Sequence, residues 1–445
     1  MTGKIGMVSL GCPKNQIDAE QMLARLTEAG FTVTPNEAEA DAIIVNTCGF
    51  IEEAKTEAIE NILEVAAYKK SGNLKALIVT GCLAERYRDE ITDLIPEVDL
   101  VVSIGRNAEI VPLVSAALEG KAENAYAPAE AMSMDGGRIL TTPAYTAYLK
   151  VADGCDNCCT YCAIPAIRGR FRSRPMEEVV AEARRLAAGG VKELIVVAQD
   201  TTGYGADLYG EPKLAELLEE LCAIEGLHWI RTLYTYPDRI TDRLLDLIAR
   251  EEKLVPYLDI PLQHCDKEIL RRMNRTGDRE SLTALLTHIR KKVPGITLRT
   301  TLITGFPGED EAAFSSLAEF VREIRFDRLG CFAYSAEEGT PAADFPDQVE
   351  EQVRQDRMEN IMTDQLTISS EKNAEKLGTQ LEVLVEGYDS YIRCYFGRSA
   401  ADAPDIDGKV FFISPKPLEI GSFVQVQIND TIEYDLLGEL YEEKA

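Results

Sequence analysis

The chain has 445 residues, enough for two or three domains, and its apolar and charged fractions of 45% and 27% are those of an ordinary globular protein. Its 75 Asp and Glu against 47 Lys and Arg leave a formal net charge of −28, which disfavours binding to a phosphate backbone and favours a basic protein partner. No apolar run reaches the ~20 residues of a membrane-spanning helix and the start lacks a signal-peptide pattern, so we expect a cytoplasmic protein.

Residues 1–120 alternate short apolar runs with helical patterns. The runs at residues 5–10, 42–46 and 74–80 are nearly continuous, as in parallel strands that are covered on both faces. This alternation predicts an N-terminal, doubly wound α/β domain.

A cysteine follows each of these three predicted strands: Cys12, Cys48 and Cys82. Parallel strands end at one edge of their sheet, so the three thiols are expected to converge there. A glycine beside each cysteine would let the backbone approach a bulky ligand closely. The pattern suggests an iron–sulfur cluster with one iron left open. Three unrelated buried cysteines are the alternative.

Residues 121–143 have no sustained periodicity and are predicted to be a linker. The segment from 144 to 375 resumes the βα alternation. Six βα units predict a partial TIM-type (βα)6 barrel, whose functional loops follow the strands. The predicted strands are residues 147–151, 194–198, 229–234, 255–260, 296–301 and 329–334.

Four cysteines lie within eight residues after the first of these strands: Cys155, Cys158, Cys159 and Cys162. The spacing C-x3-C-x2-C of Cys155, Cys159 and Cys162 suits a cluster that binds a small molecule at its open iron. Reduced cytosolic thiols favour such metal binding over disulfides. Cys155/Cys158 and Cys159/Cys162 also form two C-x2-C pairs, which suit tetrahedral zinc, so the loop favours a cluster but leaves zinc open.

Residues 376–445 contain short alternating segments that predict a small five-stranded β-barrel. A charged helix over residues 350–376 is expected to lead into it. The barrel has six Lys and Arg against thirteen Asp and Glu, a balance that disfavours nucleic-acid binding.

The cysteine constellation resembles that of the radical SAM methylthiotransferases. The resemblance spans nearly the whole chain and is carried by C-x3-C-x2-C, by Leu-Gly-Cys-Pro-Lys-Asn at residues 10–15 and by the loops around Cys48 and Cys82. Residues 198–201, 207–210, 236–238 and 259–264 are most similar to the RimO branch. Cys158 departs from the family pattern. The resemblance implies a methylthiotransferase α/β domain over 1–120, a radical SAM core over 144–375 and a TRAM-like barrel over 376–445.

The same resemblance implies two 4Fe–4S clusters and S-adenosylmethionine as cofactors, with no catalytic residue beyond the cluster ligands. The first would be held by Cys155, Cys159 and Cys162, and the second by Cys12, Cys48 and Cys82. Lys14 and Asn15, beside Cys12, would tune that cluster or form a plain helix-entry turn. The implied S-adenosylmethionine contacts are Tyr161, Ile303 and Gly305.

RimO-type enzymes place a methylthio group on the β-carbon of an aspartate in the twelfth small-subunit ribosomal protein, with a low-potential electron donor. Two alternatives stay open at this point. Sister branches with the same six cysteines modify an adenosine in transfer RNA, and a zinc-stabilised, non-enzymatic interaction protein would use Cys155, Cys158, Cys159 and Cys162.

Overall fold

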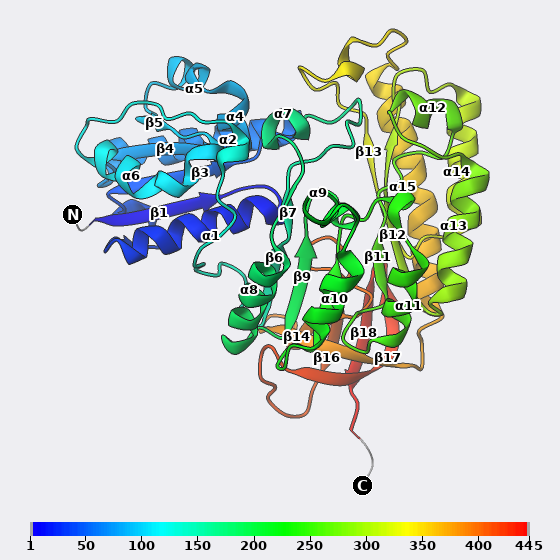
Figure 1. The fold of residues 1–445 in the computed structure, drawn as a ribbon. Helices are drawn as coiled ribbons and strands as arrows, with labels where there is room; N and C mark the ends of the chain where they lie inside the picture. The colour runs from blue at the N-terminus through cyan, green and yellow to red at the C-terminus, as the bar shows by residue number, and fades with distance from the viewer. Residues whose placement is uncertain (1–2, 443–445) are drawn as a thin grey trace.

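The computed structural model describes residues 3–442, which form three modules in chain order (Figure 1). The N-terminal module lies beside the central strands, and the C-terminal strands lie at one end of them. No helix within residues 3–442 is both long and apolar enough to cross a membrane.

The N-terminal module is built on a five-stranded, all-parallel sheet in the order β2-β1-β3-β4-β5. Its strands are β1 (Lys4–Ser9), β2 (Thr32–Val33), β3 (Ala42–Thr47), β4 (Ala76–Gly81) and β5 (Leu100–Val101). Its helices are α1 (Pro13–Glu28), α2 (Glu52–Ala66), α3 (Tyr68–Ser71), α4 (Cys82–Tyr87), α5 (Asp89–Leu94) and α6 (Ile110–Leu118).

Helices cover both faces of this sheet. α1 and α6 pack on one face and α2, α4 and α5 on the other, which is why β3 and β4 are wholly buried. The three predicted strands correspond to β1, β3 and β4, and the doubly wound architecture is confirmed. Strand order reverses between β1 and β3, and ligands bind beyond the carboxyl ends of the strands at such a switch point.

The central module is an open barrel of six strands. β6, β9 and β10 form one parallel sheet and β11, β12 and β13 a second. The two meet where the N–H of Thr235 donates to the carbonyl of Asp259 at 2.9 Å. The six strands correspond to the six predicted ones: β6 (Thr146–Lys150), β9 (Glu193–Val197), β10 (Trp229–Thr232), β11 (Tyr257–Asp259), β12 (Thr297–Thr304) and β13 (Arg328–Ala333).

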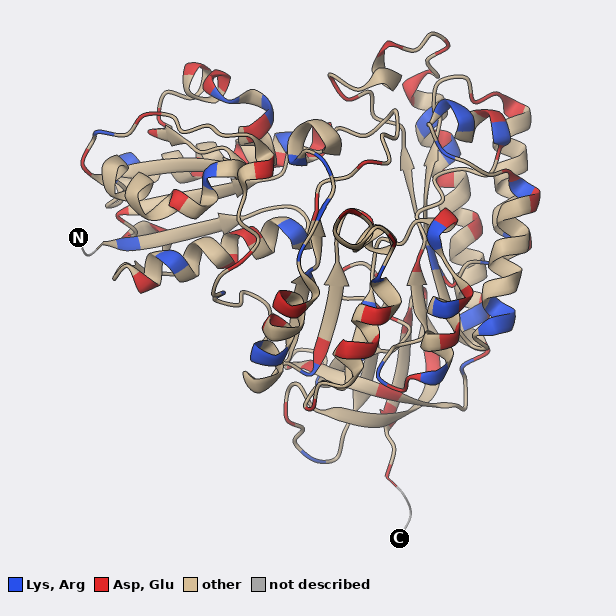
Figure 2. Cartoon of the chain, viewed as in Figure 1, with Lys and Arg blue, Asp and Glu red and all other residues tan. Residues whose placement is uncertain are grey.

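Helices surround the outside of this partial barrel (Figure 1). A short antiparallel pair, β7 (Ala152–Asp153) and β8 (Arg172–Ser173), follows β6. The helices are α7 (Ile164–Arg168), α8 (Met176–Ala188), α9 (Ala206–Tyr209), α10 (Leu214–Cys222), α11 (Asp242–Arg250), α12 (Lys267–Arg272), α13 (Arg279–Lys292), α14 (Glu311–Ile324) and α15 (Glu351–Ala374). Surface helices carry mixed charges, with acidic residues prominent on α8 and α10 (Figure 2).

The C-terminal module is a closed barrel in the order β14-β15-β16-β18-β17, as predicted. All pairings are antiparallel except β16 with β18. The strands are β14 (Gln380–Asp389), β15 (Cys394–Ser399), β16 (Val410–Ile413), β17 (Phe423–Ile432) and β18 (Asp435–Leu440).

Buried polar contacts fasten this small barrel to the amino ends of the central strands. Arg398 Nη2 lies 2.5 Å from Glu193 Oε2 at the start of β9. Tyr257, at the start of β11, donates to Asp407 at 2.6 Å, and Arg328 of β13 pairs with Asp402. The C-terminal barrel therefore closes the end of the central module opposite the loops that follow the strands.

Candidate active site

Six cysteines from two modules line a single cavity of about 390 Å³. Three of them follow strands of the N-terminal sheet and three lie in the loop after β7. They are Cys12, Cys48, Cys82, Cys155, Cys159 and Cys162. The cavity lies at the β1/β3 switch point of one module and at the carboxyl mouth of the other, the position where α/β folds place ligands.

Cys12, Cys48 and Cys82 form the first triad. Their loops are held together by a glycine and an asparagine. A Cβ on Gly11 would lie 2.8 Å from Cys48 Cβ, and Gly11 has a φ of +85°. The amide of Asn15 donates to the carbonyls of Leu10 at 2.7 Å and Thr47 at 3.2 Å, which joins the two cysteine loops. The absence of a side chain at residue 11 is therefore what lets the Cys12 and Cys48 loops meet.

Gly11→Ala is expected to lower the iron content of anaerobically reconstituted protein by roughly half, from about eight irons to about four per chain. The added methyl collides with Cys48 and strains a left-handed backbone, whereas the second triad is untouched. Iron and sulfide analysis measures this. Gly190→Ala is the matched control, because a Cβ on this left-handed glycine meets open space. Full iron in Gly11→Ala would show that the close approach is dispensable.

Burial and nearby cations have opposite effects on the pKa values of the first triad's thiols. Burial would raise the pKa of Cys12, but the cations Lys14 and Arg168 outweigh burial and lower that pKa. Burial dominates at the other two thiols and raises the pKa of Cys48, and that of Cys82 to about 12. Arg168 Nη2 lies 3.8 Å from Cys82 Sγ and can donate to it. Iron binds deprotonated thiols, so cations beside this triad suit a cluster.

Cys155, Cys159 and Cys162 form the second triad, which occupies a tightly wound loop. Cys155 N–H donates to the carbonyl of Gly169 at 3.2 Å, and Cys162 N–H donates to the carbonyl of Cys159 at 3.0 Å. Burial raises the pKa of Cys155 to about 11 and that of Cys162 to about 12. Arg275 Nη1 lies 3.7 Å from Cys159 Sγ, a donor beside the middle thiol of this triad.

Cys158 stands apart from the other cysteines of this loop. Its side chain is exposed, its φ is +50°, and it is absent from the cavity lining. Within residues 3–442, no three His, Cys, Asp or Glu side chains gather as ligands of one ion. A cube does not require that, because its thiolates bind different irons. The donor set therefore fits two cubes, whereas the zinc alternative would need Cys158 as its fourth ligand.

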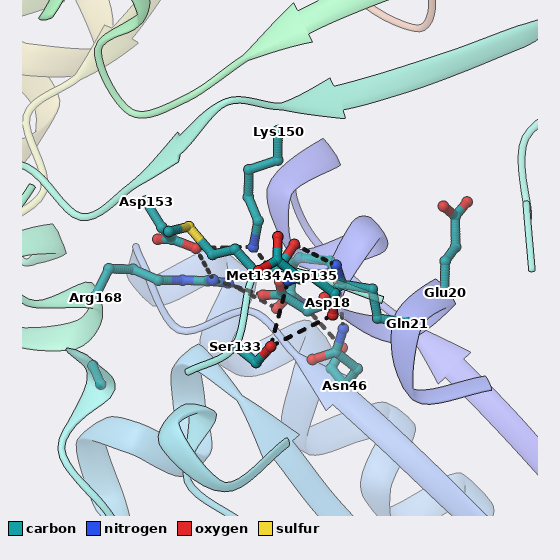
Figure 3. A network of polar contacts seen from close by, with 12 residues as sticks. Asp18, Glu20, Gln21, Asn46, Ser133, Met134, Asp135, Lys150, Asp153 and Arg168 are labelled. Carbon is teal, nitrogen blue, oxygen red and sulfur yellow. Dashed lines mark hydrogen bonds and ion pairs between the residues drawn. The ribbon is translucent and has the colours of Figure 1, made fainter. Parts of the chain in front are cut away.

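A buried ionic network lies beside the cysteine loops, and Figure 3 shows its members Asp18, Lys150, Asp153 and Arg168. Arg168 Nη1 lies 2.6 Å from Asp18 Oδ2 of α1 and 3.2 Å from Asp153 Oδ2 of β7. Lys150 Nζ pairs with the same two carboxylates, at 2.9 Å from Asp153. Burial opposes the charge of Asp153, but Lys150 and Arg168 outweigh it and hold the pKa of that carboxyl well below its usual range. Two cations thus balance two anions with almost no exposure.

The network connects the N-terminal module to the loop of the second triad. Asp153 immediately precedes the Gly154-Cys155 turn, and its Oδ1 accepts from Gly154 N at 2.8 Å. Arg168 donates to Asn15 Oδ1 at 3.1 Å as well as approaching Cys82. Asp18, Lys150, Asp153 and Arg168 have no role that could be assigned from the sequence. A lysine inside the apolar strand at 147–151 was the one available signal.

The predicted S-adenosylmethionine contacts are distributed unequally. Tyr161 lines the cavity. Ile303 is not among the lining residues but packs with Tyr161 in one apolar cluster around Phe306. Gly305 lies against α15, because a Cβ there would sit 2.3 Å from Arg354 Cγ. Their role as cofactor contacts stays a prediction.

Loops after several central strands complete the wall, as expected for this fold. The segments 199–201, 236–238 and 261–264, which were expected at the barrel mouth because they follow predicted strands, contribute Gln199, Asp200, Tyr236, Pro261 and Gln263. The wall also includes Asn157 of the cysteine loop, and Tyr234, Thr235 and Arg275, which were not expected there. His264 does not line it. That ring is buried, with Nε2 3.3 Å from Glu309 Oε2.

Comparisons with known proteins agree with this architecture. Family models match residues 4–103 (Uncharacterized protein family UPF0004), 149–321 (Radical SAM superfamily) and 377–440 (TRAM domain). The chain is 51% identical to a protein of Desulforamulus reducens over 98% of this chain and 99% of the relative, and 52% identical to one of Pelotomaculum thermopropionicum over the same shares. Both relatives are named "Ribosomal protein uS12 methylthiotransferase RimO".

Solved structures show the same fold at low identity. The radical S-adenosylmethionine methyltransferase TsrM of Kitasatospora setae, bound to tryptophan and a SAM analogue, has a TM-score of 0.58 at 12% identity, covering 82% of this chain and 89% of that one. The cobalamin-dependent enzyme OxsB has a TM-score of 0.50 at 12% identity, over 82% of this chain and 58% of that one.

Proposed function

This chain belongs to the RimO family of radical SAM methylthiotransferases, and from that premise we propose that it adds a methylthio group to the β-carbon of an aspartate in ribosomal protein uS12. The observation that carries the proposal is the convergence of six cysteines, three from each module, on one cavity in a chain that matches these relatives over 98% of its length.

The family implies a 4Fe–4S cluster and S-adenosylmethionine. We assign the cluster to Cys155, Cys159 and Cys162, all three of which line the cavity. When bound, this cofactor pair supplies a carbon radical able to remove hydrogen from an unactivated carbon, a reaction beyond the reach of protein side chains. Tyr161 and Ile303 would pack beside the cofactor, and Arg275 would donate to the cluster at Cys159.

We assign a second 4Fe–4S cluster to Cys12, Cys48 and Cys82. Supporting this assignment are the shared cavity, the close contact at Gly11 and the cations that face these thiols. The ionic network around Arg168 would keep the two triads at a fixed separation. Walls from both modules would exclude water and protect a reactive species from side reactions.

The partners follow from charge and from the relatives' names. A ribosomal protein is a basic partner, and the net charge of −28 favours encounter with one. A ribosomal-protein substrate also suits the cytoplasmic location that we expect, and the radical chemistry requires a low-potential electron donor. The acidic C-terminal barrel lies at the far end of the central strands, so it would act in recruitment rather than in the cavity.

Mass spectrometry of cells lacking this gene tests the substrate. We expect ribosomal protein uS12 to lose a methylthio group, a change of about 46 Da, while methylthiolated adenosine in transfer RNA stays at its normal level. Restoring the gene returns the modification, and restoring a Cys159→Ala variant does not. Loss from transfer RNA with uS12 unchanged would instead support the alternative substrate.

A further inference from the structure

Lys14 is a buried cation on the wall of the cavity. Its exposure is 7%, and its Nζ lies 3.5 Å from the ring centroid of Tyr234. No Asp or Glu of the described chain forms an ion pair with it. An ammonium group without a carboxylate partner is expensive to bury, and a cation–π contact offsets only part of that cost.

The other charged side chains on this wall have protein partners. Arg168 faces Asp18 and Asp153. Arg275 donates to the carbonyl of Pro261 at 2.6 Å and covers the ring of Tyr236. Asp200 pairs with Arg239. Lys14 and Arg275 are thus the cations lining the cavity that pair with no carboxylate of the described chain, and Arg275 donates to a carbonyl and approaches a thiol, whereas Lys14 contacts only the ring of Tyr234.

Two residues of the cavity wall that Lys14 shares have a strained backbone. Tyr234 and Gln263 follow β10 and β11 with φ of +61° and +74°, in the left-handed region that side chains disfavour. Tyr234 is held there, because its N–H donates to Asp259 Oδ2 at 3.0 Å and its carbonyl accepts from Thr201 N at 3.0 Å. Strain that the surrounding structure enforces is typical of ligand-binding positions.

We propose that Lys14, seated on the ring of Tyr234, binds the side-chain carboxylate of the target aspartate. The inference rests on the proposed function, since it requires that the substrate is an aspartate. An incoming carboxylate supplies the missing counter-charge, and a desolvated ion pair in this cavity distinguishes Asp from the neutral, nearly isosteric Asn. Lys14 is two residues from Cys12, so the bound side chain would lie in the space that both triads line.

The competing role for Lys14 is to balance charge on the first triad itself. In that case its loss would disturb iron loading or weaken all substrates alike. The two roles separate in a double-mutant cycle between Lys14 and the substrate carboxylate, because only direct pairing makes the effects of the two changes depend on each other.

The cycle uses anaerobic, iron-loaded enzyme without an electron donor, so that binding is measured without turnover. Fluorescently labelled uS12, with its target aspartate intact or replaced by Asn, is titrated with wild-type enzyme and with Lys14→Met. Wild type is expected to bind the Asp form at least about tenfold more tightly than the Asn form. Lys14→Met is expected to bind both forms equally, as weakly as wild type binds the Asn form, with unchanged iron content and S-adenosylmethionine affinity.

Lys75→Met is the control, because Lys75 is an exposed lysine of the same module that pairs with Asp41; it should match wild type for both forms. The inference is overturned if Lys14→Met weakens the Asp and Asn forms by the same factor, if wild type does not discriminate between them, or if the variant loses iron. If one of these results is obtained while the wild-type enzyme modifies uS12 normally, the inference about Lys14 fails and the proposed function is retained. Absence of uS12 modification by wild type would overturn both.

Discussion

Cys159→Ala should lose about half of its iron and all detectable methylthiolation, whereas Cys158→Ala should keep both. The two cysteines are neighbours in the sequence but differ in position. Cys159 lines the cavity with Arg275 3.7 Å from its sulfur, and Cys158 is exposed with no place on the wall. A cube that loses one of three protein ligands is released, and the radical chemistry is lost with it.

The matching experiment on the other triad is Cys48→Ala. This variant should also lose about four of roughly eight irons and all methylthiolation. It should still cleave S-adenosylmethionine reductively, because that reaction needs only the cluster at Cys155, Cys159 and Cys162. Iron analysis, product analysis of the cleaved cofactor and mass spectrometry of uS12 measure the three outcomes. Iron retained by Cys159→Ala but lost from Cys158→Ala would reverse the ligand assignment.

The three-module architecture could be predicted because its long strands leave a strong pattern. Parallel strands covered on both faces read as apolar runs, and β3, β4 and β9 are of this kind. The edge strands β2 and β5 contain two residues each, too few for any periodicity, and were not predicted.

The site was only partly predictable from sequence. Placement of one cysteine after each strand predicts convergence, because topology alone brings strand ends together. Side-chain direction is not fixed by topology, and two predictions illustrate this. The cysteine spacing does not show whether Cys158 is a ligand, whereas its exposure in the structure separates it from Cys155, Cys159 and Cys162. Gly305 follows the expected strand but lies against Arg354 and not on the cavity wall.

Pairing between distant charges could not be predicted, although the lysine inside the apolar run at 147–151 indicates that a buried charge needs a partner. Asp18, Lys150, Asp153 and Arg168 are ordinary charged residues in the sequence, and only the docking of α1 against β6 and α7 makes them a buried, neutral set. Burial turns such a set from a weak surface interaction into one whose disruption is costly, because each remaining charge loses both water and partner.

Arg168→Met is accordingly expected to destabilise the protein by about 3–5 kcal/mol, the cost of leaving a buried charge without its partner. Asp18 and Asp153 would then share Lys150 alone, with a net negative charge in a site that is no more than 2% exposed. Urea unfolding of the iron-loaded protein, followed by circular dichroism, should show the first transition at lower denaturant. Arg170→Met is the control: this arginine is 81% exposed, its pair with Asp156 lies at the surface, and its loss should cost less than about 1 kcal/mol.

A second change separates charge balance from lost packing. Adding Asp18→Asn to Arg168→Met leaves one cation, Lys150, facing one anion, Asp153, so the double variant should recover part of the lost stability even though it carries two substitutions. Loss of packing alone predicts the opposite, a further decrease. Equal transitions for Arg168→Met and Arg170→Met would mean that the network does not hold the modules together, and the fixed separation of the two cysteine triads would then need another cause.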